Sequence, residues 1–308
     1  MKGFFIWIRC LEVVKTKMGL FTLFAKNQLK LLWSFKVNRE HEIIWKLLIS
    51  PNGILAGEER NTETKTASLF ALEVVTGKLF WRDKSLDEAW WFNTEKATEK
   101  NLYIQKFRKP DMPEPQGIIA VDIHTGDVRW EQPDVSMLFE FDNKIYAQRE
   151  AFGRKEFFAL DNHSGNVLEA YGSEKENILS LQSLVVDNDF HSVYSTPITP
   201  DDPEFEPIGT LLGDVLKVEE LRGSIDFVEF GKYVIFCYHE RIVGNAEAAL
   251  DNRMCNKLKV LDTDKSEIVY ADELNSNTPY PVPENFFIHQ GILIYVKEKR
   301  EVIGISLK

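Results

Sequence analysis

The sequence predicts an all-β fold, in particular a six-bladed β-propeller, and three observations support this prediction. A hairpin-like segment recurs along the 308 residues, at Phe70–Trp81 and again at Ile119–Trp130. Two further short β-like runs precede each copy, so one repeat holds four strands, which is the content of a propeller blade. The two chain ends each carry half of the repeat, as expected when one blade is shared between the termini.

The two copies align without a gap, and two weaker copies follow in the same frame. The third begins at Phe158 and has Glu169 at the tryptophan position, whereas the fourth begins at Val260 and reaches Tyr270 there. The residues that define the repeat are Glu73, Thr76, Gly77, Trp81, Asp122, Thr125, Gly126, Trp130, Asp161, Gly165, Asp262 and Tyr270. We interpret them as structural residues of a β-hairpin. The acid accepts hydrogen bonds in the turn, the glycine adopts a positive φ, and the second strand ends on an aromatic residue.

The chain ends predict how the ring closes. Residues 303–307 resemble the first half of the repeat and then stop, while residues 30–33 resemble its second half and end on Trp33. We therefore expect the C-terminal strand to pair with a strand near the N-terminus. This pairing would remove the open edges that an unclosed ring presents to other chains.

The spacing of the aromatic position predicts the number of blades. Positions 33, 81, 130, 169 and 270 are separated by 48, 49, 39 and 101 residues, and the last gap is long enough for about two blades. We assign residues 178–223 to a degenerate blade, which gives six blades, with seven as the alternative. The propeller would occupy residues 29–308 as one domain. A poorly defined extension over residues 1–28 would precede it, with Met18 as an alternative start.

The pattern Ala-Leu-Asp-x-x-Thr-Gly-x-x-x-Trp resembles the repeat of the PQQ-like, or quinoprotein-type, β-propellers. The whole arrangement is similar to a bacterial propeller family of unknown function. The resemblance implies that the tryptophan packs between neighbouring blades, a role that Trp33, Trp81 and Trp130 match and from which Glu169 departs. Enzymes of this superfamily resemble one another in an adjacent cysteine pair over the quinone. All three cysteines here are isolated, so we expect no PQQ and no other cofactor.

Composition limits the classes of partner and the compartment. The chain has 37 Lys and Arg against 48 Asp and Glu, a net charge of −11, which is opposite to the charge that nucleic acid and anionic membranes attract. The sequence contains no CxxC pair, no convincing secretory or lipoprotein signal and no apolar run long enough to span a membrane. We therefore expect a soluble, cytoplasmic and monomeric protein.

Motifs that carry chemistry are absent from the sequence. It has no Gly-x-Ser-x-Gly elbow, no glycine-rich phosphate loop and no histidine pair at metal-ligand spacing, so no metal site is expected. We favour a non-catalytic binding or scaffold protein whose partner is a protein. The alternative is a small-ligand-binding protein, or an enzyme of hydrolytic or lyase type, that uses the central channel of the propeller.

Two segments are candidate partner surfaces. In Trp90-Trp91-Phe92, strand alternation would point Trp91 away from its two neighbours. The second segment is a loop broken by prolines, whose acidic residues are Asp201, Asp202, Glu204 and Glu206. Two other long insertions, residues 108–116 and 244–257, are further places where function could reside.

Overall fold

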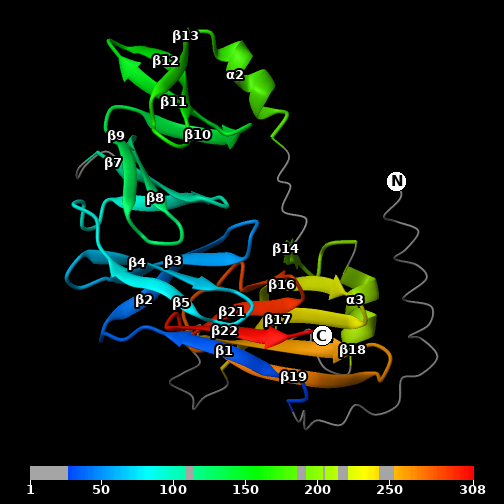
Figure 1. Ribbon diagram of the computed structural model, residues 1–308. Coiled ribbons are helices and arrows are strands. Elements are labelled where there is room, and N and C mark those ends of the chain that lie inside the picture. The colour runs from blue at the N-terminus through cyan, green and yellow to red at the C-terminus, as the bar shows by residue number, and fades with distance from the viewer. Residues whose placement is uncertain (1–26, 109–113, 186–191, 204, 214–220, 243–252) are drawn as a thin grey trace. The chain divides into compact units, whose positions relative to one another are not determined.

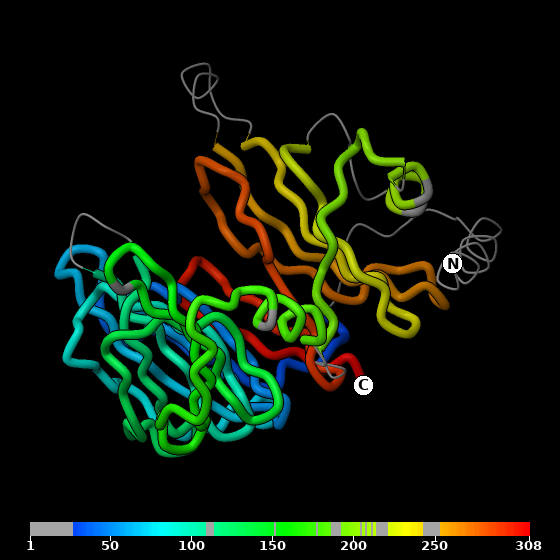
Figure 2. The backbone as a smooth tube through the Cα atoms, turned by 90° about the horizontal axis from the view of Figure 1, so that it is seen from above, coloured from blue at the N-terminus to red at the C-terminus, as the bar shows by residue number. Residues whose placement is uncertain are grey.

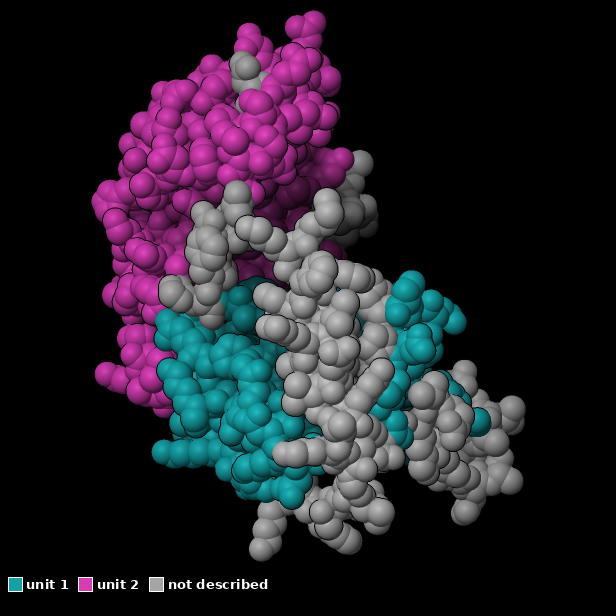
Figure 3. All heavy atoms as spheres, turned by 90° about the vertical axis from the view of Figure 1, so that its right-hand side faces the viewer, with its two compact units in different colours: residues 1–36, 192–308 teal, residues 37–191 magenta. Residues whose placement is uncertain are grey.

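A computed structural model describes residues 27–108, 114–185, 192–203, 205–213, 221–242 and 253–308 (Figure 1). In these residues the fold is all-β, with strands β1–β22 in five antiparallel sheets and two helices of eight residues each, α2 and α3. The chain divides into two compact units, residues 37–191 and residues 1–36 with 192–308 (Figure 3). Every sheet has four or five strands, the size of a propeller blade.

The unit of residues 37–191 contains three four-stranded sheets, in each of which every strand pairs with the next one in the chain. The first sheet comprises β2 (Glu42–Ile49), β3 (Ile54–Asn61), β4 (Thr66–Glu73) and β5 (Leu79–Lys84). The second comprises β6 (Phe92–Ala97), β7 (Asn101–Phe107), β8 (Pro115–Asp122) and β9 (Val128–Gln132). The third comprises β10 (Ser136–Phe141), β11 (Lys144–Ala151), β12 (Arg154–Asp161) and β13 (Val167–Gly172), and α2 (Lys175–Gln182) follows it.

The other unit contains two five-stranded sheets. The fourth sheet comprises β15 (Thr196–Ile198), β16 (Leu221–Phe230), β17 (Tyr233–Arg241), β18 (Met254–Asp262) and β19 (Glu267–Thr278), whose yellow and orange strands run side by side in Figure 2. The fifth comprises β1 (Leu31–Lys36), β22 (Glu301–Ser306), β21 (Ile292–Lys297), β20 (Phe286–His289) and β14 (Ser192–Tyr194). Helix α3 (Phe205–Leu212) packs its apolar residues against the fourth sheet.

The two chain ends share the fifth sheet. Strand β1 pairs antiparallel with β22, and Trp33 lies opposite Gly304, as the two half-repeats in the sequence predict. Residues 1–26 of the expected N-terminal extension, including the alternative start, lie outside the described residues.

The assignment of residues 178–223 to a separate, degenerate blade is wrong. Among the described residues of this stretch, the two strands are only three residues long and extend neighbouring sheets, because β14 pairs with β20 and β15 pairs with β16. The stretch also holds α3 and most of α2. The described residues therefore form five sheets, where six or seven blades were expected.

The turn of each repeat is held by its acid. Asp122 accepts hydrogen bonds from the amides of the residues two and three positions later, at 2.8 and 3.0 Å, and Asp161 and Asp262 accept the equivalent hydrogen bonds in their turns. The glycines of the first three copies have φ of 71°, 74° and 71°, a region that a side chain disfavours. The fourth copy lacks this glycine, and Ser266 adopts a φ of 53° instead.

Tryptophans join the three sheets of residues 37–191. The Trp81 indole donates to the carbonyl of Ile123 at 2.9 Å, and a Cβ added to Gly126 would lie 2.7 Å from its ring. Trp130 makes the equivalent contacts between the second and third sheets. Its indole donates to the carbonyl of Asn162 at 3.1 Å, and its ring covers Gly165. Gly126 and Gly165 therefore leave room for the ring of the preceding sheet as well as supplying a positive φ.

The register identifies equivalent positions in the other sheets. Trp130 lies opposite Ala120, Glu169 opposite Ala159 and Tyr270 opposite Val260, each on the last strand of its sheet in the repeat. Tyr270 is buried, and its hydroxyl contacts that of Tyr295 in the fifth sheet at 2.7 Å. An aromatic residue at this position therefore joins adjacent sheets in both units.

Candidate functional site

Trp45 and Trp90 lie close together at the first and second sheets, and Trp91 follows Trp90 in the chain; we call these three residues the tryptophan platform. Trp45 on β2 is 53% exposed, and Trp91, just before β6, is 37% exposed. Trp90 is half-buried, and its ring centroid lies 6.5 Å from that of Trp45. Trp45 and Trp91 therefore expose indole surface to solvent at neighbouring sheets.

A buried arginine supports the platform from below. The Arg60 guanidinium lies 5.2 Å from the Trp45 ring centroid, 5.0 Å from that of Trp90 and 5.2 Å from that of Phe92. The residue is only 5% exposed. Its guanidinium also donates to the carbonyl oxygens of Trp90, at 3.1 Å, and of Phe92. Cation–π contacts and backbone hydrogen bonds therefore orient two of the three rings.

The arginine is itself held by a fully buried carboxylate. Glu58 and Arg60 are two residues apart on β3 and so face the same side, and Arg60 Nε donates to Glu58 Oε2 at 2.8 Å. The other carboxylate oxygen accepts from the backbone amide of Thr94 at 2.6 Å and from its hydroxyl at 2.8 Å. A buried ion pair is stable only when its remaining hydrogen-bonding capacity is used in this way.

The same strand position links the next pair of sheets. Glu58 on β3 and Gln105 on β7 each lie opposite the residue four positions before the turn acid. Gln105 accepts a hydrogen bond from the amide of Met137 at 2.7 Å, as Glu58 accepts from Thr94. Both donors, Thr94 and Met137, lie directly before a bulge in the first strand of the following sheet. Glu58 is therefore a link between sheets.

The segment before β6 is fixed by its backbone. The Glu88 carboxylate accepts from the amides of Trp90 and Trp91 at 3.1 and 3.0 Å, and the Trp91 carbonyl accepts from the amide of Phe107 at 2.9 Å. The Lys65 ammonium lies 4.9 Å from the Trp90 ring centroid. The platform therefore combines open apolar surface with a nearby positive charge, an arrangement suited to binding.

On the opposite side of β3, Glu59 pairs with Arg82, and this pair does not belong to the platform. Burial raises the pKa of Glu59, and the hydrogen bond from Arg82 partly offsets the rise. Glu58, Glu59 and Arg60 are thus three consecutive charged residues inside a buried strand.

The sequence reasoning singled out Trp90 and Trp91 but missed Trp45, Glu58 and Arg60. The available signal was the charged run Glu58–Arg60 within an otherwise apolar strand, because charge there requires partners from a neighbouring element. Both tryptophans precede β6 and only Phe92 lies in it. The Trp90 and Phe92 rings nevertheless both lie at the Arg60 guanidinium, as the predicted alternation of these residues requires.

The predicted acidic loop serves as a turn before α3. Asp202 accepts from the amide of Thr199 at 2.6 Å and from its hydroxyl at 2.8 Å, and these hydrogen bonds lower the pKa of Asp202. Asp201 and Glu206 are exposed on either side, whereas Glu204 lies outside the described residues. Residues 109–113 and 243–252, in the two other long insertions, also lie outside them.

A second buried polar cluster occurs in the fourth sheet. The Cys237 thiol donates to Asn256 at 2.8 Å, and the Asp226 carboxylate accepts from the side-chain amide of Asn285 at 2.6 Å. His239 Nε2 accepts from the amide of Val282 at 3.0 Å, which fixes the segment that leads into β20. Burial raises the pKa of Cys237 well above its usual value, so this thiol is a poor nucleophile.

Neither a metal cluster nor a membrane helix is found in the described part of the chain. There, no three His, Cys, Asp or Glu side chains are grouped as metal ligands. Neither α2 nor α3 approaches the length and apolarity that a membrane-crossing helix needs.

Comparisons with known proteins give one family match within the chain. A family profile described as a domain of unknown function, DUF4905, matches residues 49–130, which include Glu58, Arg60, Trp90 and Trp91. No curated protein matches the sequence significantly.

Several solved structures are similar in outline. One is a crystal structure of a eukaryotic initiation factor, with 11% identity and a TM-score of 0.35 over 82% of this chain; the match covers 58% of that protein's chain. The β-propeller domain of the Trilobed protease from Pyrococcus furiosus has 9% identity and a TM-score of 0.35, over 88% of this chain and 95% of that one. The Dos1 propeller has 11% identity and a TM-score of 0.30, with 86% and 68% covered. Such TM-scores assign no function.

Proposed function

We propose that this protein is a non-catalytic binding protein of the β-propeller type, and that it binds a segment of another protein through the tryptophan platform. One observation carries the proposal: the exposed indole of Trp45 and the half-buried indole of Trp90 pack on a buried, hydrogen-bonded support, Arg60 with Glu58, and Trp91, the next residue in the chain, is exposed as well. Rigid aromatic groups at a surface lose little conformational entropy when a partner binds.

The residue types are those that dominate protein interfaces. Tryptophan and arginine are enriched among the few residues that contribute most of the binding energy, and such residues lie in well-packed surroundings. The platform meets both conditions, since Arg60 holds two of the rings and Glu88 holds the backbone that carries Trp90 and Trp91.

The finer expectations belong to the same proposal. We propose that the described sheets are blades of one closed propeller over residues 29–308, and that the propeller is related to the PQQ-like superfamily. We also propose that the protein is cytoplasmic and monomeric and binds no cofactor. The supporting feature is the repeated joint, in which an aromatic residue of one sheet packs on the next.

The test is comparative affinity capture. Three tagged proteins are incubated with the native lysate: wild type, the double variant Trp45→Ala/Trp91→Ala, and the control Tyr280→Ala. The bound proteins are quantified by mass spectrometry. Tyr280 is an aromatic residue outside the platform and is 76% exposed, so its replacement controls for nonspecific binding to exposed aromatic surface. We expect a protein that wild type and Tyr280→Ala retain equally and that the double variant loses at least about tenfold, as for a hot spot.

The same interaction is then measured with the two purified proteins. If the captured set is empty, or if wild type and the double variant retain it equally, the platform does not bind a protein. The small-ligand alternative would then be the next hypothesis.

A further inference from the structure

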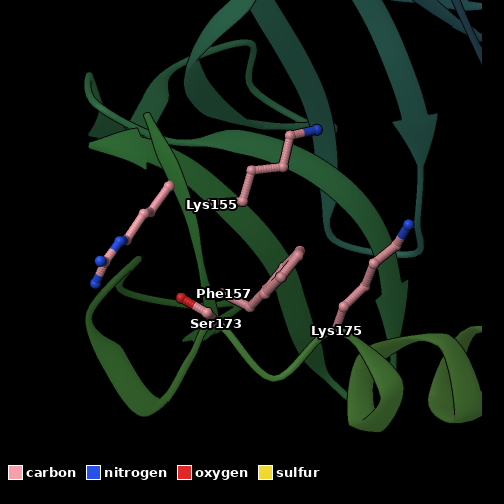
Figure 4. Close-up of a pocket in the computed structure, with 5 residues that line it drawn as sticks. Lys155, Phe157, Ser173 and Lys175 are labelled. Carbon is pink, nitrogen blue, oxygen red and sulfur yellow. The ribbon is translucent and has the colours of Figure 1, made fainter. Parts of the chain in front are cut away.

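The third sheet and α2 together form a shallow hollow of about 450 Å³, which we call the cation hollow. It is lined by Arg154, Lys155, Phe157, Ser173 and Lys175. Figure 4 shows the Phe157 ring between the Lys155 and Lys175 side chains, both of which extend to the same side of the ring. Phe157 is packed in the core of this sheet with Tyr146 and Ile178, so the floor of the hollow is apolar and fixed.

The pairing of charges around this sheet is uneven. Residues 136–182 contain five Lys and Arg against eight Asp and Glu. The two cations outside the hollow are paired, Lys144 with Glu169 and Arg149 with Glu156, each at 2.6 Å. The three cations that line the hollow make no ion pair with any residue that the structure describes. Unpaired positive charge is therefore concentrated in the hollow, although the segment and the whole chain are acidic.

One carboxylate could compete with a ligand. Glu150 lies opposite Lys155 in the ladder between β11 and β12, yet the two form no ion pair within the described residues. Glu156, the next acid on β12, is engaged by Arg149. A group that carries close to two negative charges would attract Lys155 more strongly than Glu150 does.

We propose that the cation hollow binds a phosphate monoester, with Lys155 and Lys175 beside the dianion and Ser173 donating a hydrogen bond. Ammonium, guanidinium and hydroxyl groups are the donors that hold phosphate in proteins. A monoester carries about −1.5 to −2 at pH 7. The hollow lies within the size range of small-molecule sites, about 300–1,000 Å³, so it has room for an organic group over Phe157. The site shares no residue with the tryptophan platform.

The experiment is a titration of the full-length protein with phenyl phosphate, followed through the backbone amides of Lys155, Ser173 and Lys175 by NMR at constant ionic strength. Inorganic phosphate and benzoate are the comparison ligands, because one lacks the ring and the other carries a single charge. We expect saturable shifts with phenyl phosphate, and binding of benzoate at least about tenfold weaker, because it loses the second charge.

Two double variants make the test specific. Lys155→Gln/Lys175→Gln should weaken the binding of phenyl phosphate at least about tenfold. Lys144→Gln/Arg149→Gln removes two positive charges from the third sheet outside the hollow, and its affinity for phenyl phosphate should stay within about twofold of wild type. Both hollow lysines are exposed, and thermal unfolding verifies that each variant is folded. Shifts that do not saturate, equal losses in the two variants, or equal binding of benzoate would each overturn the proposal. If only the hollow variant proves unfolded, Ser173→Ala, at an exposed position, must itself weaken binding for the proposal to stand.

Discussion

The joints after the first two sheets and the end of the third sheet provide a direct comparison. Trp81 and Trp130 are buried against the turn glycine of the following sheet. Glu169 occupies the equivalent register position in the third sheet, but it is exposed and bonds to Lys144 and Tyr171 of its own sheet. The apolar residues of this sheet are covered by α2 instead, through Ile178. The aromatic residue therefore occurs where a following sheet supplies a glycine turn, and a polar residue replaces it where a helix follows.

The buried polar links follow the same division. Glu58 and Gln105 accept hydrogen bonds from the sheet that follows theirs, so each of the first two sheets has an aromatic and a polar link to its neighbour. Gln148 is the corresponding residue on β11, opposite Phe157, and it is only half-buried. The third sheet, which α2 follows in the chain, thus differs from the first two at both positions.

The largest expected effect comes from removing an aromatic joint. Trp130→Ala should lower the free energy of unfolding by about 3–5 kcal/mol, because it removes a buried indole and its hydrogen bond and leaves a cavity above Gly165. Urea denaturation followed by circular dichroism measures the change. An unchanged midpoint would mean that the indole does not hold the second and third sheets together.

The partner glycine tests the same joint from the other side. Gly165→Ala should lower the free energy of unfolding by about 1–3 kcal/mol because of the left-handed backbone alone. The loss should be larger still, because the new Cβ would lie 2.6 Å from the Trp130 ring. Gly153→Ala is the matched control, since Gly153 has a similar φ of 73° but no atom lies near its added Cβ. If the two variants lose equal stability in the same denaturation experiment, the contact with Trp130 contributes nothing.

A polar joint, unlike an aromatic one, should respond to pH. Burial lowers the pKa of His239, and Asp226 partly offsets this, so the folded protein holds the neutral ring while the unfolded chain protonates more readily. The stability that depends on His239 is therefore complete above its unfolded pKa of about 6.5 and declines as the pH falls from there toward the folded pKa.

His239→Gln should reduce this pH dependence, because glutamine can still accept from the amide of Val282 but does not titrate. Denaturation at pH 7.5 and at pH 5.5 compares the two proteins. A loss of stability between these two pH values that is as large in the variant as in wild type would show that other groups cause it.

The smallest effect is expected at the position where the aromatic residue is missing. Glu169→Ala should leave the midpoint of unfolding nearly unchanged, since the side chain is exposed and its ion pair with Lys144 lies at the surface. Thermal unfolding of Glu169→Ala beside Trp130→Ala makes the comparison. A loss as large as that of Trp130→Ala would contradict the idea that this position matters only where another sheet follows.

Much of the fold could be predicted from local sequence. The turn acids, the positive-φ glycines and the pairing of the two chain ends are properties of segments of a dozen residues or fewer, so their pattern is visible along the chain. The degenerate blade was not predictable in this way. Residues 178–223 contain β-like runs, but whether such a run forms its own sheet or extends a neighbouring one depends on which strand edges are available, as for β14 and β15.

The sequence alone determined the repeated hairpin, because a turn acid, a glycine with positive φ and a terminal aromatic residue act within one short segment. The candidate site was decided by the tertiary structure. Trp45, Arg60 and Trp90 are separated by 15 and 30 residues in the chain, and a repeat pattern says nothing of which residues will meet across two sheets. The same holds for Lys155 and Lys175, whose convergence depends on α2 packing beside the third sheet. Side chains from separate elements come together only when burial of the apolar faces brings those elements into contact.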